Sequence, residues 1–131
     1  MNIEAELCAP TGLFIVEDDP SLGWALRAMM EDSGYHVIGL SRTEDEAVRS
    51  ARRLRPMAII MDLKLAMGGS GIVAAHAIRR FSRAPIVFYT AYADLRGLAE
   101  QIREIGDARL VGKPDDKELR RVVDAFLSRG P

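Results

Sequence analysis

The chain has 131 residues, enough for one domain, and 48% of them are hydrophobic while 28% are charged. This composition excludes a disordered tail and a collagen-like repeat, and a chain of this length can build a core without disulfides or metal. Its 18 basic and 19 acidic residues give a net charge of −1. No overall positive field would therefore draw it to nucleic acid or to an anionic membrane.

The cysteine content and the hydropathy pattern predict the compartment. Cys8 is the single cysteine, so it forms no internal disulfide and suits a reducing cytosol. No apolar run is long enough to span a bilayer, and the N-terminus lacks the basic-then-apolar pattern of a signal peptide. We expect a cytoplasmic protein that binds neither membranes nor nucleic acid directly.

Short apolar runs alternate with longer amphipathic stretches five times along the chain. They follow a leader at 1–12, which we expect to be poorly ordered, and form a domain predicted at 13–129. The predicted strands are 13–16, 37–40, 58–61, 85–89 and 109–111. The predicted helices run from Pro20 to Gly34, from Thr43 to Pro56, over 72–81, over 94–105, and from Asp116 to Leu127.

Capping residues mark the starts of several predicted helices. Asp19 is followed by a proline, which favours the first helical position. Thr43 and Glu46 have the spacing of a capping box, and Asp116 is predicted to cap the last helix. A glycine-rich turn at 68–71 follows the third strand. These signals agree with the apolar periodicity and support five strand–helix units.

The predicted strands are apolar on both faces, which indicates a parallel sheet covered by helices on each side. The expected fold class is therefore α/β with a doubly wound five-stranded parallel sheet. Right-handed crossovers place the C-terminal ends of all strands at one edge. Ligand sites in such sheets lie at that edge, beside the point where the strand order reverses.

Polar residues follow four of the five predicted strands. Glu17 and Asp18 follow the first strand, Asp62 the third, Thr90 the fourth and Lys113 the fifth. Taken alone, the threonine suits a strand and the lysine suits a solvated surface. Asp62 is harder to explain in this way, because it follows four apolar residues and an unpaired buried carboxylate costs several kcal/mol.

Three carboxylates that converge on one edge repel one another unless a cation lies between them. A hard divalent ion with oxygen ligands fits this set, and Mg²⁺ is the expected cofactor. A zinc site is not expected, because Cys8, His36 and His76 are scattered, and we interpret both histidines as surface residues.

A magnesium ion beside a carboxylate, with a hydroxyl and an ammonium from neighbouring strands, is an arrangement typical of phosphoryl transfer. Lys113 and the ion would neutralise the phosphoryl oxygens, and Thr90 would donate a hydrogen bond to them. Asp62 would be the nucleophile that forms an aspartyl phosphate.

In these motifs the sequence resembles the receiver domain of two-component response regulators, of the chemotaxis-type single-domain architecture. The matching segments are Ile-Val-Glu-Asp-Asp-Pro at 15–20, Ile-Ile-Met-Asp-Leu at 59–63, Tyr-Thr-Ala at 89–91 and Gly-Lys-Pro at 112–114. The resemblance covers almost the whole chain. It implies a flavodoxin-like (βα)5 fold with strand order 2-1-3-4-5.

The resemblance also implies roles for particular residues. The implied metal ligands are Glu17, Asp18, Asp62 and the backbone carbonyl of Lys64. The residues implied to act on the phosphoryl group are Asp62, Thr90 and Lys113. The implied function is a phosphorylation switch that catalyses only its own phosphorylation and dephosphorylation, and is not an enzyme acting on other substrates.

The implied partners are proteins. A sensor histidine kinase or phosphotransfer protein would supply the phosphoryl group. A downstream protein would bind the face built by the helix at 94–105, the strand at 109–111 and the last helix. We expect a stand-alone regulator, and we leave homodimerisation open.

The sequence departs from the family pattern at three places. Ala66 replaces the usual proline, and the loop at 67–71 is one residue longer, which we interpret as a tolerated insertion. Leu110 stands where many receivers carry an aromatic switch residue. Lys64 and Tyr92 occupy the variable positions beside the site, where we expect them to shield an aspartyl phosphate from water.

Three other functions were weighed against the receiver interpretation. A phosphatase of the haloacid-dehalogenase type needs an acid two residues after its nucleophile, where this chain has Lys64. A flavodoxin-like nucleotide-binding module needs a phosphate loop after the first strand, where this chain has acidic residues that repel phosphate. A receiver-like docking module without phosphorylation is not favoured, because every chemically required residue is present.

Overall fold

A five-stranded parallel sheet forms the centre of the computed structural model, which describes residues 12–128. Its strands are β1 (Gly12–Val16), β2 (His36–Ser41), β3 (Ala58–Met61), β6 (Ile86–Thr90) and β7 (Ala108–Gly112). They lie in the order β2-β1-β3-β6-β7, and every neighbouring pair is parallel. The predicted order 2-1-3-4-5 is therefore confirmed. The leader at 1–11, with Cys8, lies outside the described residues, and Gly12 already belongs to β1.

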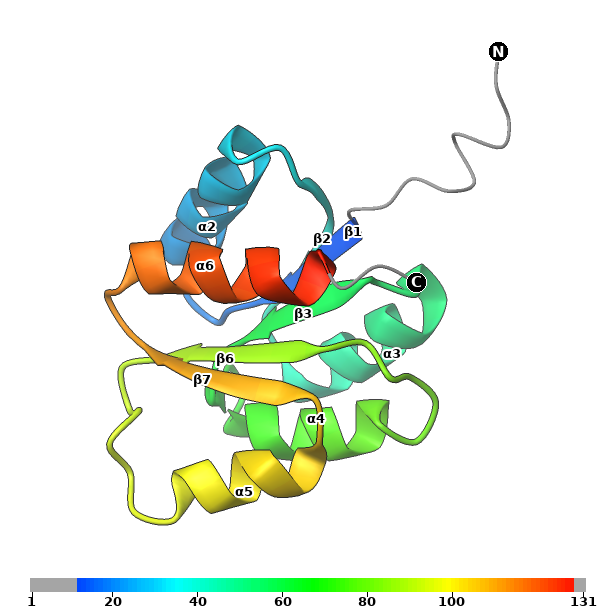
Figure 1. The fold of residues 1–131 in the computed structure, drawn as a ribbon. Coiled ribbons are helices and arrows are strands. Elements are labelled where there is room, and N and C mark those ends of the chain that lie inside the picture. The colour runs from blue at the N-terminus through cyan, green and yellow to red at the C-terminus, as the bar shows by residue number, and fades with distance from the viewer. Residues whose placement is uncertain (1–11, 129–131) are drawn as a thin grey trace.

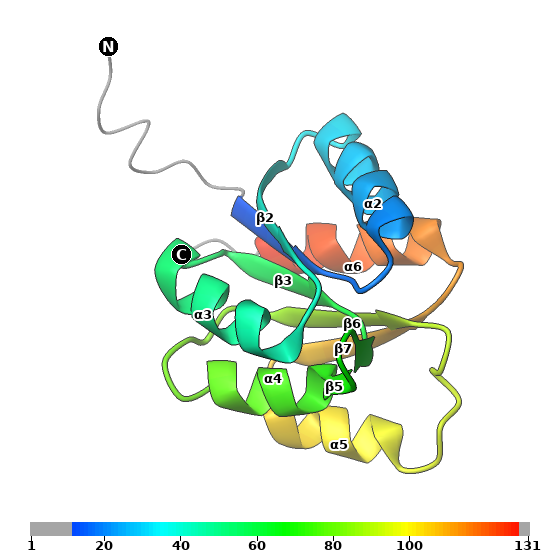
Figure 2. The same cartoon turned by 180° about the vertical axis from the view of Figure 1, so that it is seen from behind.

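Five helices cover the two faces of this sheet (Figures 1 and 2). Helices α3, α4 and α5 pack on one face, and α2 and α6 pack on the other. The bounds are α2 Pro20–Asp32, α3 Glu44–Leu54, α4 Gly71–Ile78, α5 Leu98–Ile105 and α6 Asp116–Leu127. The predicted doubly wound α/β fold is confirmed.

The period of the strands explains the two hydrophobic cores. Along β1, Phe14 and Val16 face α3, α4 and α5, while Leu13 and Ile15 face α2 and α6. Side chains alternate between the faces of a sheet, so a strand that is apolar at every position is buried on both sides. In β3 all four residues are buried for the same reason.

Three helix boundaries differ from the prediction. The fourth predicted helix begins at Leu98 and not at Asp94, because 91–97 forms turns and Gly97 has a left-handed φ of +78°. The third ends at Ile78 and continues as a turn, not as a helix to residue 81. The cap of α6 is Asp115, whose side chain accepts a hydrogen bond from the backbone N–H of Glu118, and not Asp116.

The predicted caps of α2 and α3 are present. Asp19 accepts a hydrogen bond from the N–H of Ser21, and Thr43 accepts one from the N–H of Glu46. The capping box is incomplete, since the Glu46 carboxylate accepts from the N–H of Arg42 and not from that of Thr43. Among residues 12–128, no helix is long and apolar enough to cross a membrane.

A single arginine ties the turn after α4 to the loop before β7. The guanidinium of Arg79 donates hydrogen bonds to five backbone carbonyls, those of Ser82, Ala84, Ile105, Gly106 and Asp107. The carbonyls of Ser82, Ala84 and Gly106 lie outside the helices and strands, that of Ile105 ends α5, and that of Asp107 also accepts from the N–H of Ile86. The planar guanidinium thus satisfies carbonyls at the ends of regular elements.

We expect Arg79→Lys to lower the free energy of unfolding by about 2 kcal/mol, because an ammonium group cannot reach all five carbonyls. Urea denaturation measures the change. Arg80→Lys is the matched control, since the Arg80 side chain is exposed and makes no hydrogen bond or ion pair within residues 12–128. Equal stability of both variants would contradict this role for Arg79.

Candidate functional site

Three carboxylates converge at the C-terminal edge of the sheet. Glu17 and Asp18 follow β1, and Asp62 follows the neighbouring strand β3, on the two sides of the point where the strand order reverses. One oxygen from each carboxylate lies within 4.8 Å of the others. Glu17 and Asp62 are buried and Asp18 is half-buried. The structure therefore brings together the acidic residues that the sequence analysis selected.

Lys113 joins this cluster from the far edge of the sheet. Its Nζ lies 2.8 Å from Oε1 of Glu17 and 2.9 Å from Oδ2 of Asp62. The lysine side chain is only 15% exposed, so both ion pairs are shielded from water and are stronger than pairs on an open surface. One ammonium group thus bridges two buried carboxylates.

The backbone holds Asp62 in place on its other side. Its Oδ1 accepts a hydrogen bond of 2.7 Å from the N–H of Leu63, so both carboxylate oxygens have partners. Gly71 packs directly against it, since a Cβ at residue 71 would lie 1.9 Å from the carbonyl oxygen of Asp62. The sequence analysis treated Gly71 only as a turn residue, although its position after the aspartate was a signal for close packing.

Burial determines the proton affinities of the cluster. It raises the pKa of Glu17 to about 7, with the Asp18 and Asp62 carboxylates adding to the shift and Lys113 opposing it. Burial alone would lower the pKa of Lys113, but the hydrogen bonds to Glu17 and Asp62 outweigh it and raise that pKa. Lys113 is therefore charged at neutral pH, while Glu17 titrates near it.

Thr90 is fully buried at the end of β6, next to the strand that carries Asp62. Its Oγ1 accepts a hydrogen bond of 3.1 Å from the N–H of Tyr92. This turn directs the chain away from a helical path after β6, which is a further reason why α5 begins late. The hydroxyl proton is left free to donate to a group in the site.

Lys64 and Tyr92 come together beside the cluster. Nζ of Lys64 lies 4.1 Å from the centre of the Tyr92 ring, a cation–π contact between the segment after β3 and the segment after β6. Both residues are exposed. Their contact forms part of the rim of the site, as expected for the two variable positions.

Tyr89 contacts Lys113, and the sequence analysis did not select this residue. Its ring lies 5.9 Å from Nζ of Lys113, and its hydroxyl donates a hydrogen bond to the carboxylate of Asp116. Burial and this carboxylate raise the pKa of Tyr89. The hydrogen bond connects β6 to the start of α6 near Lys113.

The long loop after β3 folds as a small hairpin, which was not predicted. Strands β4 (Lys64–Leu65) and β5 (Gly69–Ser70) pair antiparallel, and Met67 and Gly68 between them have left-handed φ values of 63° and 73°. These angles are those of a tight hairpin turn, which glycine favours at one of the two positions. The added residue is thus absorbed in a regular turn.

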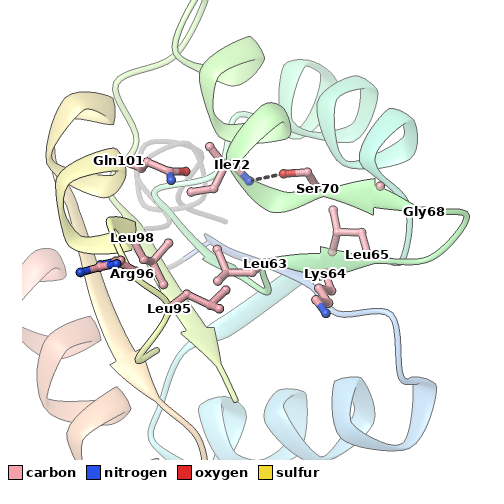
Figure 3. Close-up of a pocket in the computed structure, with 11 residues that line it drawn as sticks. Leu63, Lys64, Leu65, Gly68, Ser70, Ile72, Leu95, Arg96, Leu98 and Gln101 are labelled. Atoms are coloured by element: carbon pink, nitrogen blue, oxygen red, sulfur yellow. Dashed lines mark hydrogen bonds between the residues drawn. The ribbon is translucent and has the colours of Figure 1, made fainter. Parts of the chain in front are cut away.

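The hairpin forms one wall of a hollow of about 520 Å³ beside the acidic cluster. Figure 3 shows the hairpin on one side of this hollow and the start of α5 on the other. Leucines 63, 65, 95 and 98 line it, and Leu95 is 52% exposed. Because the segment after β6 also forms a wall, movement of that segment would change the shape of the hollow.

Leu110 lies in the middle of β7, half-buried against the core formed with α3, α4 and α5. It has no aromatic ring that could rotate between a buried and an exposed position.

The fold and this cluster together define a class of protein, the doubly wound α/β domains with an acidic cluster and a lysine at the C-terminal edge of the sheet. Residues 13–124 match the response regulator receiver domain family. The chain belongs to this family, so the predicted resemblance is confirmed.

The curated relatives that the chain matches are longer than the chain. It is 33% identical to the transcriptional regulatory protein PdtaR of Mycobacterium tuberculosis over 127 residues, 96% of this chain and 61% of PdtaR. It is 39% identical to the phyllosphere-induced regulator PhyR of Methylorubrum extorquens over 85 residues, 64% of this chain and 32% of PhyR. The match to a protein-glutamate methylesterase/protein-glutamine glutaminase of Myxococcus xanthus covers 33% of that protein.

Solved receiver domains have the same fold. The receiver domain of sensor histidine kinase PA1611 of Pseudomonas aeruginosa, solved with a magnesium ion coordinated in its active-site cleft, superposes with a TM-score of 0.78 at 34% identity, covering 92% of this chain and 99% of that one. The receiver domain of PhyR from Erythrobacter litoralis superposes with a TM-score of 0.80 at 27% identity, covering 95% and 97%. The chain is thus a receiver domain of phosphorylation-dependent signalling.

The raised pKa of Glu17 predicts a pH dependence of stability without divalent cations. Between its ordinary value of 4.5 and about 7, the folded state binds the proton more tightly than the unfolded state does. The free energy of unfolding therefore falls as the pH rises through this range. Relative to Glu17→Gln, the wild-type protein should lose about 2 kcal/mol between pH 5 and pH 8. Urea denaturation in EDTA measures the difference, and a difference that does not vary with pH would contradict the assignment.

Proposed function

We propose that the chain is a phosphorylation switch in which Asp62 accepts a phosphoryl group from a histidine kinase or phosphotransfer protein in the presence of Mg²⁺. The observation that carries this proposal is the position of Asp62, a buried carboxylate within reach of two further carboxylates and 2.9 Å from a lysine ammonium. A structural role alone does not explain why so many like charges share one edge.

The residues at this edge fit a magnesium ion. Glu17, Asp18 and Asp62 each offer an oxygen within a span that one ion can bridge, and carboxylate and carbonyl oxygens are the ligands that Mg²⁺ prefers. We assign the backbone carbonyl of Lys64 as the fourth protein ligand. When bound, the ion neutralises charge on the phosphoryl oxygens and so lowers the barrier to transfer.

In the proposed reaction, a carboxylate oxygen of Asp62 attacks the phosphorus atom of a phosphohistidine. The new P–O bond forms as the P–N bond breaks, and the histidine nitrogen leaves with the electron pair. The Lys113 ammonium, which already contacts Asp62, pairs with the phosphoryl oxygens, and the Thr90 hydroxyl donates to them. Lys113 and Thr90 thus sense the modification directly.

The segment at 91–97 and the face formed by α5, β7 and α6 would carry the signal to a downstream protein. In the structure this segment consists of turns, and it includes Tyr92, which bonds to the Thr90 hydroxyl. A Thr90 hydroxyl that turns toward a phosphoryl group would release the segment and shift the start of α5. Such a switch acts in the cytoplasm by protein contact, without direct binding of nucleic acid or membrane, and its oligomeric state stays open.

Activity on external phosphoesters is not proposed. The residue two positions after Asp62 is Lys64, whose ammonium lies against Tyr92. It cannot act as the carboxylic acid that protonates a leaving group in the haloacid-dehalogenase mechanism. The proposed activity is therefore limited to phosphorylation and dephosphorylation of the domain itself.

Incubation with acetyl phosphate and Mg²⁺ should add the mass of one phosphoryl group to the wild-type protein and nothing to Asp62→Asn, because the amide is not a nucleophile. Intact-protein mass spectrometry measures this. Addition of EDTA should abolish the mass increase. Modification of Asp62→Asn, or no modification of the wild type, would contradict the proposal.

The contact between Lys64 and Tyr92 predicts a long-lived phosphoryl group, because together they hinder water from reaching it. Lys64→Asn and Tyr92→Ala should each accelerate dephosphorylation by about tenfold, equivalent to ~1.4 kcal/mol of barrier. Loss of the added mass over time measures the rate. The control is Lys117→Asn, at an exposed position of α6. Unchanged decay in both site variants would reject this role.

A further inference from the structure

A second hollow, also of about 520 Å³, lies at the end of the molecule opposite Asp62. It is formed where α3 ends before β3 and where α4 ends before β6, and Figure 2 shows these two helices side by side. Its lining residues are Ala51, Arg52, Arg55, Pro56, Phe81, Ser82 and Arg83. We call it the arginine hollow.

Within the described residues the arginines of the hollow form no ion pairs, although the carboxylate of Asp107 acts on the neighbouring Arg79. By contrast, Arg49 pairs with Asp45 and Arg103 pairs with Glu100. Between Glu46 and Asp94 the sequence contains a single acid, and it is the site aspartate. The domain is nearly neutral as a whole, so this local excess of positive charge is a property of the hollow.

Helix dipoles account for part of this pattern. Cations are favourable in the last turn of a helix, which explains Arg52 near the end of α3. They do not explain Arg55, which caps α3 with a left-handed φ of 50°, a conformation that favours glycine or asparagine. Arg83 lies beyond the end of α4. Neither the helix dipole nor the backbone conformation therefore accounts for arginine at these two positions.

Several contacts prepare the hollow for an anion. Cζ of Arg52 lies 4.4 Å from the centre of the Phe81 ring, which restrains its guanidinium. The Ser82 hydroxyl accepts from the N–H of Ala84, so its own proton is available to donate. Arg79 occupies the carbonyl oxygens of Ser82 and Ala84, which would otherwise repel an anion.

Arg83 of the hollow lies close enough to Arg79, outside it, for the two charges to repel each other. Burial lowers the pKa of Arg79, neighbouring Asp107 opposes this, and the positive charge of Arg83 lowers it further. A bound anion would relieve this repulsion.

We propose that the arginine hollow binds a small ligand that carries two or more negative charges on phosphate or carboxylate groups. Its volume lies within the range of small-molecule sites. Arginine without lysine is typical of sites that hold planar or tetrahedral oxyanions through paired N–H groups. A small ligand is favoured over nucleic acid because the net charge of −1 provides no field that would attract a long polyanion.

Isothermal titration calorimetry of the full chain, in buffer freed of divalent cations by a chelating resin, tests the proposal. The probes are inorganic pyrophosphate and citrate, which separate phosphate from carboxylate ligands. We expect saturable binding of at least one probe, weakened about tenfold by Arg55→Gln and again by Arg83→Gln. Arg103→Gln, which removes the same charge from the surface of α5, should change the affinity less than twofold.

Arg55→Gly separates binding from folding. Glycine suits the left-handed backbone, so this variant should unfold at the same or a higher temperature while it loses affinity. Lack of saturable binding of both probes, equal loss in Arg103→Gln, or tighter binding of duplex DNA than of pyrophosphate would each overturn the proposal. Asp62→Asn should bind as the wild type does, so this result does not depend on the proposed phosphorylation.

Discussion

A lysine ammonium group shared by two buried carboxylates holds the functional end of this domain together. Lys113 follows β7 at one edge of the sheet, while Glu17 follows β1, which is separated from β7 by β3 and β6. The ion pairs therefore connect loops from strands that are not neighbours. Glu17 and Asp62 are at most 9% exposed, and without a cation between them one carboxylate would have to take up a proton. Any change in charge at Asp62 must alter this balance.

The parallel architecture gives the molecule two chemically different ends. Every helix begins at the C-terminal edge of the sheet and ends at the opposite edge, so backbone N–H groups face one end and carbonyl groups the other. The end that carries Asp62 gathers acidic residues that invite a cation, and Lys113 supplies one. The opposite end gathers guanidinium groups around the arginine hollow. Helices α3 and α4 run from the end that carries Asp62 to the end that carries the arginine hollow.

Particular elements show how far the sequence could be interpreted before the structure was known. The strand at 58–61 was predicted without error, because the five apolar residues between Pro56 and Asp62 are too few for a helix and favour a buried strand. The start of α5 was misplaced by four residues, since helical spacing in 94–97 could not reveal that Thr90 and Gly97 turn the chain aside. The hairpin at 64–70 was missed because its two-residue strands are too short to show a period.

For the candidate site too, some features could be predicted from the sequence and others only from the structure. Residue types at the ends of successive apolar runs were sufficient to select Glu17, Asp62 and Lys113, because right-handed crossovers bring all such ends to one edge. Local signals in the chain alone determined the number of strands in the central sheet, their parallel arrangement and the choice of the acidic residues. Only the tertiary structure decided that one ammonium bridges Glu17 and Asp62, that Gly71 must lack a side chain, and that Arg79 satisfies five carbonyls. Most of these contacts join residues that are far apart in the sequence. Packing sets their distances, and no local pattern of residues predicts them.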